Sequence, residues 1–220
     1  YQKSTGKSIG AGLYYNAIGI FQSEEEIENY PHWPGAKPGD IIFEDYDKNG
    51  VIDGNDKVRI DKSSVPKFTT GLNIDMAYKG FDLSVLFQGA FGGVFYETTE
   101  SGDFGNFLKS FYDNRWTVEK KQNDYPRTYD RNNQYWVSQG NTFWLHKTDY
   151  IRLKNIEIGY TLPQSFTKKF WTERVRVYVN AFNILTFSPD MKDYDPEAVN
   201  GNGYAYPLNK VVNFGFNLTF

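Results

Sequence analysis

The chain of 220 residues carries 24 lysines and arginines against 27 aspartates and glutamates, a formal net charge of −3, so it lacks the basic surplus of a nucleic-acid-binding protein. Aromatic residues make up 18% of the sequence, which excludes a disordered chain. The absence of cysteine excludes disulfides, thiolate zinc sites and cysteine nucleophiles, and two histidines, His32 and His146, leave little for a histidine-based metal centre.

The N-terminal sequence YQKSTGKSIGAG has no basic start followed by an apolar run, so no signal peptide is expected. No stretch approaches the roughly 18 consecutive apolar residues of a membrane-spanning helix, which excludes a helical membrane protein. A β-barrel stays open, because alternating strands never raise the average hydropathy much.

Residues 1–65 are predicted to be mostly loop. A possible strand spans 10–21, and SEEEIENY (23–30) is an acidic stretch compatible with a short helix. Pro38-Gly39-Asp40 followed by Ile-Ile-Phe reads as a turn and then a strand.

The segment DYDKNGVIDGND matches the spacing of an EF-hand-type calcium loop, with oxygen-bearing side chains at positions 1, 3, 5, 9 and 12 and glycine at position 6. The last position carries aspartate in place of glutamate, so weaker binding is expected. The alternative is a loop held by its own Asx turns. The candidate calcium ligands are Asp45, Asp47, Asn49, the carbonyl group of Val51, Asp53 and Asp56, with Gly50 at the turn and Ile52 as an apolar anchor.

Strict alternation of apolar and polar residues predicts a hairpin of two strands, 69–79 and 81–92, joined by the two-residue turn Lys79-Gly80. Further on, NFLKSFYDNRW (106–116) reads as a helix within a loop. Its packed side chains are predicted to be Phe107, Leu108, Phe111 and Tyr112.

Three more strands are predicted at 149–162, 174–187 and 211–220. In the first, the apolar parity shifts between Leu153 and Ile156, which predicts a β-bulge. The other two each present one apolar face and one polar face. Their apolar residues are Val175, Val177, Val179 and Ala181 in the one, and Val212, Phe214, Phe216, Leu218 and Phe220 in the other.

The predicted connections differ greatly in length. The turn at 79–80 and the basic segment 163–173 are short, whereas 1–65, 93–148 and 188–208 are long and leave the strands at the end opposite Phe220. Long loops on one rim and short turns on the other are typical of outer-membrane barrels. Because the smallest such barrels need about eight strands, five strands are expected to form only the C-terminal part of a larger barrel.

Four of the five tryptophans lie in the long connections and are candidates for stacking on sugars or for anchoring a partner: Trp33, Trp116, Trp136 and Trp144. The alternatives are that they fill the cores of the loops or form an interfacial aromatic belt. Motifs for hydrolysis, zinc catalysis or phosphate binding are absent, so no enzyme is predicted.

Several segments in order resemble the C-terminal third to quarter of SusC/RagA-type TonB-dependent outer-membrane transporters of Bacteroidota. They are GIFQSEEEIENYP (19–31), PGDIIFEDYDKNGVIDGNDKVRI (38–60), VPKFTTGLNIDMAYKGFDLSVLFQG (65–89), NRWT (114–117), YIRLKNIEIGYTLP (150–163), VRVYVNAFNILTF (175–187) and the terminal VVNFGFNLTF.

The resemblance implies an all-β fold: the closing antiparallel strands of a transmembrane barrel of about 22 strands with long extracellular loops. It implies nutrient import, of a glycan or a peptide, with a SusD-like surface lipoprotein and with the TonB complex acting through an N-terminal plug that these residues do not include. Phe220 would belong to the signal read by the barrel-assembly machinery, in contact with outer-membrane lipid and with its end of the strand in the periplasm. The lumen-facing polar residues would include Asp75, Asp82, Gln88, Arg174 and Arg176.

The competing prediction is a soluble, calcium-stabilised β-sandwich that binds carbohydrate. The one-sided loop lengths and the aromatic terminal strand argue against it.

Overall fold

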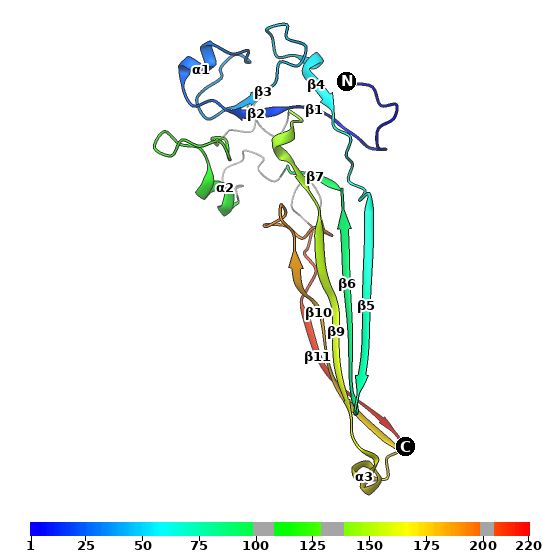
Figure 1. Cartoon of the computed structure of the whole chain (residues 1–220). Coiled ribbons are helices and arrows are strands. Elements are labelled where there is room, and N and C mark those ends of the chain that lie inside the picture. Colours follow the sequence, from blue (N-terminus) through cyan, green and yellow to red (C-terminus); the bar gives the residue numbers. More distant parts are fainter. Residues whose placement is uncertain (99–107, 129–138, 199–204) are drawn as a thin grey trace. The chain divides into compact units, whose positions relative to one another are not determined.

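The computed structural model describes residues 1–98, 108–128, 139–198 and 205–220, which form two compact units. Unit 1 consists of Tyr1–Val65, Val94–Lys147 and Val199–Ala205, and unit 2 consists of Pro66–Gly93, Thr148–Ala198 and Tyr206–Phe220 (Figure 1). The border at residue 65 coincides with the predicted end of the N-terminal loop region. None of the helices in the described ranges is long and apolar enough to cross a membrane.

Unit 2 is built on a five-stranded antiparallel sheet in which each strand pairs with the next one along the chain (Figure 1). All five predicted strands are confirmed, each end lying within one residue of its predicted position. The strands are β5 (Phe68–Tyr78), β6 (Phe81–Phe91), β9 (Tyr150–Thr161), β10 (Arg174–Phe187) and β11 (Val211–Thr219).

The turn between β5 and β6 has the predicted two residues, and both have positive φ angles, 48° at Lys79 and 87° at Gly80. Two positive φ angles define the type I′ turn, whose twist matches that of the flanking strands. The hairpin is therefore in register from Tyr78 opposite Phe81 to Phe68 opposite Phe91.

The predicted β-bulge is present in β9. Leu86 and Phe87 of β6 pair with Asn155 and Leu153, so Lys154 is the extra residue. The register of β10 shifts at the same level, between Phe182 and Leu185. The bulge keeps apolar residues on one face of the sheet along the whole of β9.

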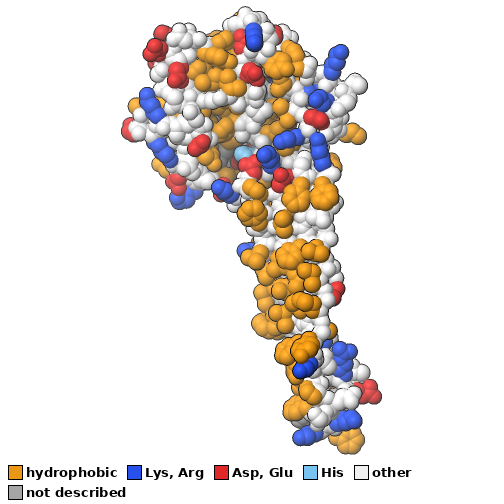
Figure 2. Space-filling view, in the orientation of Figure 1, with side chains coloured by type: hydrophobic (Ala, Val, Ile, Leu, Met, Phe, Trp, Pro, Cys, Tyr) orange, Lys and Arg blue, Asp and Glu red, His pale blue; other side chains and the backbone are white. Residues whose placement is uncertain are grey.

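One face of the sheet is apolar and exposed (Figure 2). One row of apolar residues crosses four strands: Leu83 of β6 pairs with Ile158 of β9, Ile158 pairs with Val179 of β10, and Val179 pairs with Phe214 of β11. Similar apolar rows lie before and after this one along the strands. In a β-sandwich this face would be buried against a second sheet. Phe214 is 81% exposed and Phe216 69% exposed, so the sandwich prediction is wrong for unit 2 as the structure describes it.

The long connections leave the sheet at one end and the short ones at the other. The chain enters β5 at Phe68, leaves β6 at Phe91 and enters β9 at Tyr150, and the pairings place these residues at the same end. The opposite end carries the turn at Lys79 and a short connection with α3 (Gln164–Thr167) and the 3₁₀ helix η3 (Lys168–Phe170). The predicted segregation is confirmed.

Unit 1 contains short elements around an aromatic core. The strands pair as β1 (Leu13–Tyr15) with β4 (Lys57–Arg59), β2 (Ala17–Ile20) with β3 (Ile41–Phe43), and β7 (Val94–Tyr96) with β8 (Leu145–Lys147). Its helices are α1 (Glu24–Glu28), η1 (Gly54–Asp56), α2 (Lys109–Asn114) and η2 (Thr142–Trp144). The core consists of Tyr15, Ile41, Phe43, Ile52, Phe111 and Trp144.

Two details of unit 1 differ from prediction. The possible strand at 10–21 is two strands, because the chain changes pairing partner at Asn16, whose side chain donates a hydrogen bond to Glu44 (2.7 Å). The predicted helix of 106–116 is present as α2 with Phe111 buried, but Tyr112 is 57% exposed rather than packed. Phe107 lies outside the described residues.

Candidate functional site

The polar face of the unit 2 sheet carries a charged network that crosses three strands. Arg176 of β10 donates from Nε to Asp82 Oδ1 of β6 (3.0 Å) and from Nη2 to Glu157 Oε1 of β9 (2.7 Å). Asn180 extends the network by donating to Glu157 (3.3 Å), and Asn213 of β11 donates to Asn180 (3.0 Å). The polar parity predicted for these strands is confirmed.

Gly159 makes room for this network. The residue lies between Asp82 of β6 and Tyr178 of β10, and a Cβ atom added there would collide with the guanidinium group of Arg176. The absence of a side chain lets that guanidinium reach across β9 to Asp82.

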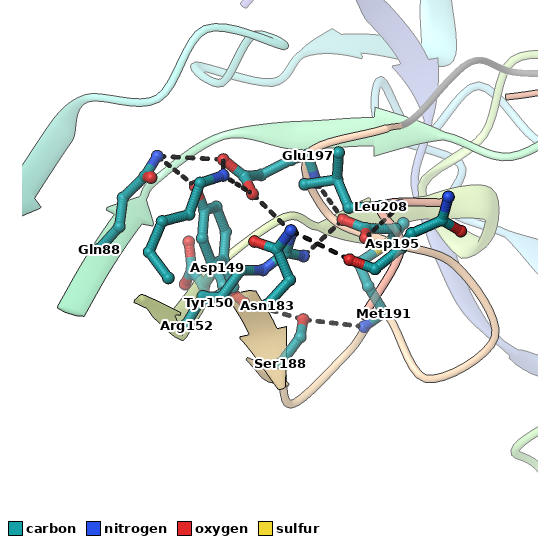
Figure 3. Close-up of polar contacts among 12 residues, drawn as sticks. Gln88, Asp149, Tyr150, Arg152, Asn183, Ser188, Met191, Asp195, Glu197 and Leu208 are labelled. Atoms are coloured by element: carbon teal, nitrogen blue, oxygen red, sulfur yellow. Dashed lines mark hydrogen bonds and ion pairs between the residues drawn. The ribbon is translucent and has the colours of Figure 1, made fainter. Parts of the chain in front are cut away.

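A second polar cluster lies around Arg152, near the end of the sheet where the long connections leave (Figure 3). Arg152 is 1% exposed, and its Nη2 donates to Asp195 Oδ1 (2.6 Å) while its Nη1 lies 2.7 Å from Glu197 Oε2. Lys154 also pairs with Glu197 (3.1 Å), and Gln88 of β6 donates to Glu197 (3.0 Å). Two cations thus face two carboxylates.

Asp195 holds the connection that follows β10 in a fixed fold. Its carboxylate accepts the backbone N–H groups of Glu197 (3.0 Å) and Leu208 (3.2 Å) as well as the guanidinium of Arg152 (Figure 3). Burial alone would raise the pKa of Asp195, but these hydrogen bonds outweigh it and the pKa lies below its usual value. Segment 188–198 is therefore fastened to the polar face of β9.

Sequence reasoning did not identify Arg152, Asp195 and Glu197. The alternation of β9 placed Arg152 on the polar face, but Asp195 lies 43 residues further along the chain in a loop without periodicity. No local pattern indicates that this loop returns to the sheet.

In unit 1, the buried Asp40 is also a residue that sequence reasoning left without a role. Its side chain accepts a hydrogen bond from Arg127 and one from the backbone N–H of Lys37 (2.9 Å), and it is fully buried. Gly39 has φ 93° and packs so closely on Trp116 that a Cβ atom would clash with the indole ring. Asp40 thus fastens the 108–128 segment to the turn before β3.

The predicted calcium loop brings three of its carboxylates together. Oxygen atoms of Asp45, Asp47 and Asp56 lie within 4.8 Å of one another. Calcium–oxygen distances of about 2.3–2.6 Å allow two ligands to be at most about 5 Å apart, so these three fit a shared cation. Gly50 has φ 83° and Ile52 is 4% exposed in the core, as predicted for the turn and the anchor.

Hydrogen bonds within the loop also use these oxygens. Asp45 accepts the N–H of Gly50 (2.9 Å), and Asp56, which is fully buried, accepts those of Tyr46 (2.8 Å) and Asp53 (2.7 Å). Asn49 accepts the N–H of Val51 (2.8 Å). The structure therefore contains Asx turns, and the group of converging carboxylates does not include Asp53.

The three tryptophans of unit 1 that the structure describes are not exposed platforms. Trp116 is 6% exposed and Trp144 1%, and Trp33 is half-buried with its Nε1 donating to the carbonyl of Ile52 (2.8 Å). The proposal that Trp116 and Trp144 stack on a ligand is therefore wrong: both stabilise the folded unit. Trp136 lies outside the described residues.

Phe220 follows β11 and is 80% exposed. Nothing in the structure tests its predicted role in barrel assembly, which stays a prediction.

No family model matches the chain. It is 32% identical over 98% of its length to TonB-dependent receptor P3 of Formosa agariphila, and 27% identical over its whole length to the TonB-dependent receptor SusC of Bacteroides thetaiotaomicron. It covers 22% of the length of each of these proteins. Among solved structures it aligns over its whole length with the RagAB peptide transporter, at a TM-score of 0.68 and 26% identity, covering 24% of that chain.

These comparisons confirm the resemblance drawn from the sequence motifs and the all-β, antiparallel fold class. The chain spans about a fifth to a quarter of the length of the proteins it matches.

Proposed function

We propose, because the chain is related over nearly its whole length to SusC- and RagA-type TonB-dependent receptors, that it forms one side of an outer-membrane import barrel. The observation that carries the proposal is the two-faced sheet of unit 2. Its exposed apolar face suits contact with lipid, and its charged opposite face suits a water-filled lumen.

The two sheet edges support this placement. Among the described strands, β5 and β11 each have a neighbour on one side only. Unpaired strand edges are not tolerated in a bilayer, so both are expected to pair with further strands of the same barrel.

The proposed activity is the import of an oligosaccharide or a peptide without chemical change. The solved RagAB structure is of a peptide transporter, which favours peptides without excluding glycans for this chain. The proposed partners are a SusD-like lipoprotein on the side of the long connections, outside the cell, and the TonB complex and the barrel-assembly machinery on the periplasmic side, where Phe220 lies.

A cysteine-labelling experiment on neighbouring residues of β11 tests the placement in the membrane. Asn213 pairs with Asn180 on the polar face, and Phe214 pairs with Val179 on the apolar face. The chain has no cysteine of its own. In intact cells, a membrane-impermeant maleimide should label Asn213→Cys and leave Phe214→Cys unlabelled, whereas both should react after denaturation in detergent.

Equal labelling of the two variants in intact cells would contradict a lipid-facing apolar side. A soluble protein would also be recovered without detergent. The transported class is tested separately, by growth of a gene-deletion strain on oligosaccharides or on peptides as the sole nutrient, with the wild-type gene restored as the control.

We also propose that the loop 45–56 binds calcium. Asp45, Asp47 and Asp56 would supply carboxylate oxygens, and the other predicted donors are Asn49, the carbonyl of Val51 and Asp53. The support is the agreement between the ligand spacing in the sequence and the convergence of three carboxylates in the structure.

Calorimetry of calcium binding to the purified protein tests this second proposal. Asp47→Asn should weaken binding at least about tenfold, because one charged oxygen ligand is lost. The matched control is Glu119→Gln, which removes the same charge from an exposed position of unit 1. Equal affinities for the two variants would reduce the loop to a cluster of Asx turns.

A further inference from the structure

The short connection between β9 and β10 is an ordered, folded segment. Thr172, which is buried, donates a hydrogen bond from its hydroxyl group to the carbonyl of the buried Thr167 (3.1 Å). At the base of the segment, Leu162 donates to the carbonyl of Val175 (2.9 Å) and Glu173 to that of Thr219 (2.8 Å). The backbone of this connection therefore has a defined position relative to the sheet of unit 2.

Trp171 projects from this ordered segment with 93% of its surface exposed. It has φ 58°, a left-handed conformation that is costly for a large side chain. Phe166, on the same connection, is 51% exposed. Tryptophan is strongly buried on average, as Trp116 and Trp144 are, so an exposed tryptophan on an ordered backbone indicates a surface that contacts something else.

The charge around Trp171 is positive. Lys168 and Lys169 are exposed on the same connection, and the only acidic residue between 163 and 173 is Glu173. The neighbouring turn adds Lys79, and this turn is tied to the end of β9 by a hydrogen bond from the N–H of Thr161 to the carbonyl of Gly80 (2.8 Å).

This basic and aromatic end continues the exposed apolar face of the sheet. Tyr78 is 71% exposed and Phe81 58%, and both lie next to the Lys79 turn. Proteins carry tryptophan, tyrosine and lysine where the edge of a lipid-facing surface meets the lipid headgroups. These three side chains suit that position because each has an apolar body and a polar tip. The positive charge selects anionic headgroups.

We propose that the connection 163–173, with the turn at Lys79, binds the phosphate groups of anionic phospholipids in the leaflet on the short-turn side of the barrel. The inference rests on the membrane placement proposed above. Lys168 and Lys169 pair with headgroup phosphates, and Trp171 inserts its indole at the level of the headgroups.

The test uses the whole receptor carrying this chain, reconstituted in nanodiscs of neutral phosphatidylcholine with a minor fraction of phosphatidylglycerol. Native mass spectrometry measures how strongly phosphatidylglycerol is retained over phosphatidylcholine. The double variant Lys168→Gln/Lys169→Gln should lower this preference by up to about 30-fold, from roughly 1 kcal/mol for each lysine near the surface. The matched control is Lys192→Gln/Lys210→Gln, which removes the same charge from exposed positions at the other ends of β10 and β11.

A second readout follows Trp171 itself. The fluorescence of Trp171 is the difference between the wild-type receptor and Trp171→Phe. We expect lipids brominated near the headgroup to quench this fluorescence and iodide in the water to leave it unquenched. An unchanged lipid preference in the double variant, an equal loss in the control, or quenching of Trp171 by iodide alone would overturn the inference and point to a protein partner or to water at this end. If the receptor enters nanodiscs normally but gives one of these contrary results, the proposed function stays intact and only the lipid-binding inference fails. If the receptor enters no bilayer, both the proposed function and the lipid-binding inference fail.

Discussion

At the scale of single residues, Arg152 shows how the polar face is stabilised. A guanidinium group that is 99% buried costs several kcal/mol to remove from water, and Asp195 and Glu197 offset that cost through two close ion pairs. The same pairs hold the connection after β10 in place. Stability and loop position therefore depend on one side chain.

Replacing this side chain should release the connection. Arg152→Met leaves two carboxylates without their main partner, and we expect the free energy of unfolding to fall by about 3 kcal/mol, the lower end of the range for a broken buried pair. Amide hydrogen exchange should become faster in segment 188–198. Lys154→Met is the control: Lys154 is 31% exposed with a single ion pair, so its loss should cost less than about 1 kcal/mol.

Asp195 gives this cluster a defined response to pH. Its pKa is lower in the folded protein than in the unfolded chain, so its stabilising contribution is fully present above the usual aspartate pKa and is lost as the pH falls through the lowered value. Segment 188–198 should stay protected from hydrogen exchange at pH 5 and lose protection only below about pH 4. In Asp195→Asn, protection should be weak at both pH values; release of the wild-type segment already at pH 5 would contradict this account.

Residue roles were predictable only where a motif fixes the spacing. The carboxylates of Asp45, Asp47 and Asp56 converge because twelve consecutive residues encode the loop. The partners of Arg152 could not be predicted, because they lie on a loop whose return to the sheet depends on tertiary structure. Burial likewise decides the role of Trp144, whose position in a long connection placed it among the possible binding residues.

At the scale of elements, the hairpin of β5 and β6 depends on the geometry of its turn. Gly80 has φ 87°, and a Cβ atom there would lie 2.9 Å from the backbone carbonyl oxygen of Thr161. The left-handed conformation therefore favours glycine, and the carbonyl oxygen of Thr161 leaves no room for a Cβ atom.

Gly80→Ala should accordingly destabilise the folded protein by about 1–2 kcal/mol or more, as measured by urea unfolding in lipid vesicles. Gly71, within β5, is the matched control. A Cβ atom there would meet the carbonyl oxygen of Phe87 at 3.8 Å, an ordinary contact, so Gly71→Ala should be neutral or slightly stabilising. Equal losses would show that the turn geometry is not limiting.

The long strands were predictable because apolar and polar residues that alternate over ten or more positions fit a strand with one apolar face and do not fit the period of a helix. Even the bulge at Lys154 follows from the parity shift between Leu153 and Ile156. The three-residue strands of unit 1 are too short to show a period, and their partners are distant in sequence, as with Leu13 opposite Arg59. Tertiary pairing defines them.

At the scale of the whole molecule, the long connection between β6 and β9 is part of a folded unit. Phe111 and Trp144 from this connection pack in the core of unit 1 with Tyr15 and Phe43. Removing the connection therefore removes part of a core as well as a surface. The strands of unit 2 do not depend on it, since Thr148 already donates a hydrogen bond to the carbonyl of Gly93 (3.1 Å) across its ends.

Trimming 94–147 to a short turn, which keeps Gly93 and Thr148, should accordingly abolish co-purification of the lipoprotein partner and uptake, while the receptor still reaches the outer membrane. Membrane fractionation and affinity purification of the tagged receptor measure the two effects. Tyr112→Ala is a milder variant, because Tyr112 is 57% exposed and its loss leaves the core intact. Failure of the trimmed receptor to insert would contradict the independence of unit 2, and normal growth on the cognate nutrient would contradict a role for the connection.

The order of the strands bears on how such a sheet can be made. Each strand of unit 2 pairs with the one synthesised before it, from β5 to β11, so the sheet can grow at one edge as the chain arrives and no strand has to be inserted between two others. The entropy of closing a connection rises only with the logarithm of its length, so the folded insertion between β6 and β9 adds little to the cost of the next pairing. At every stage a single growing edge has to be shielded from aggregation, and among the described strands the edge that stays unpaired on the growing side is that of β11.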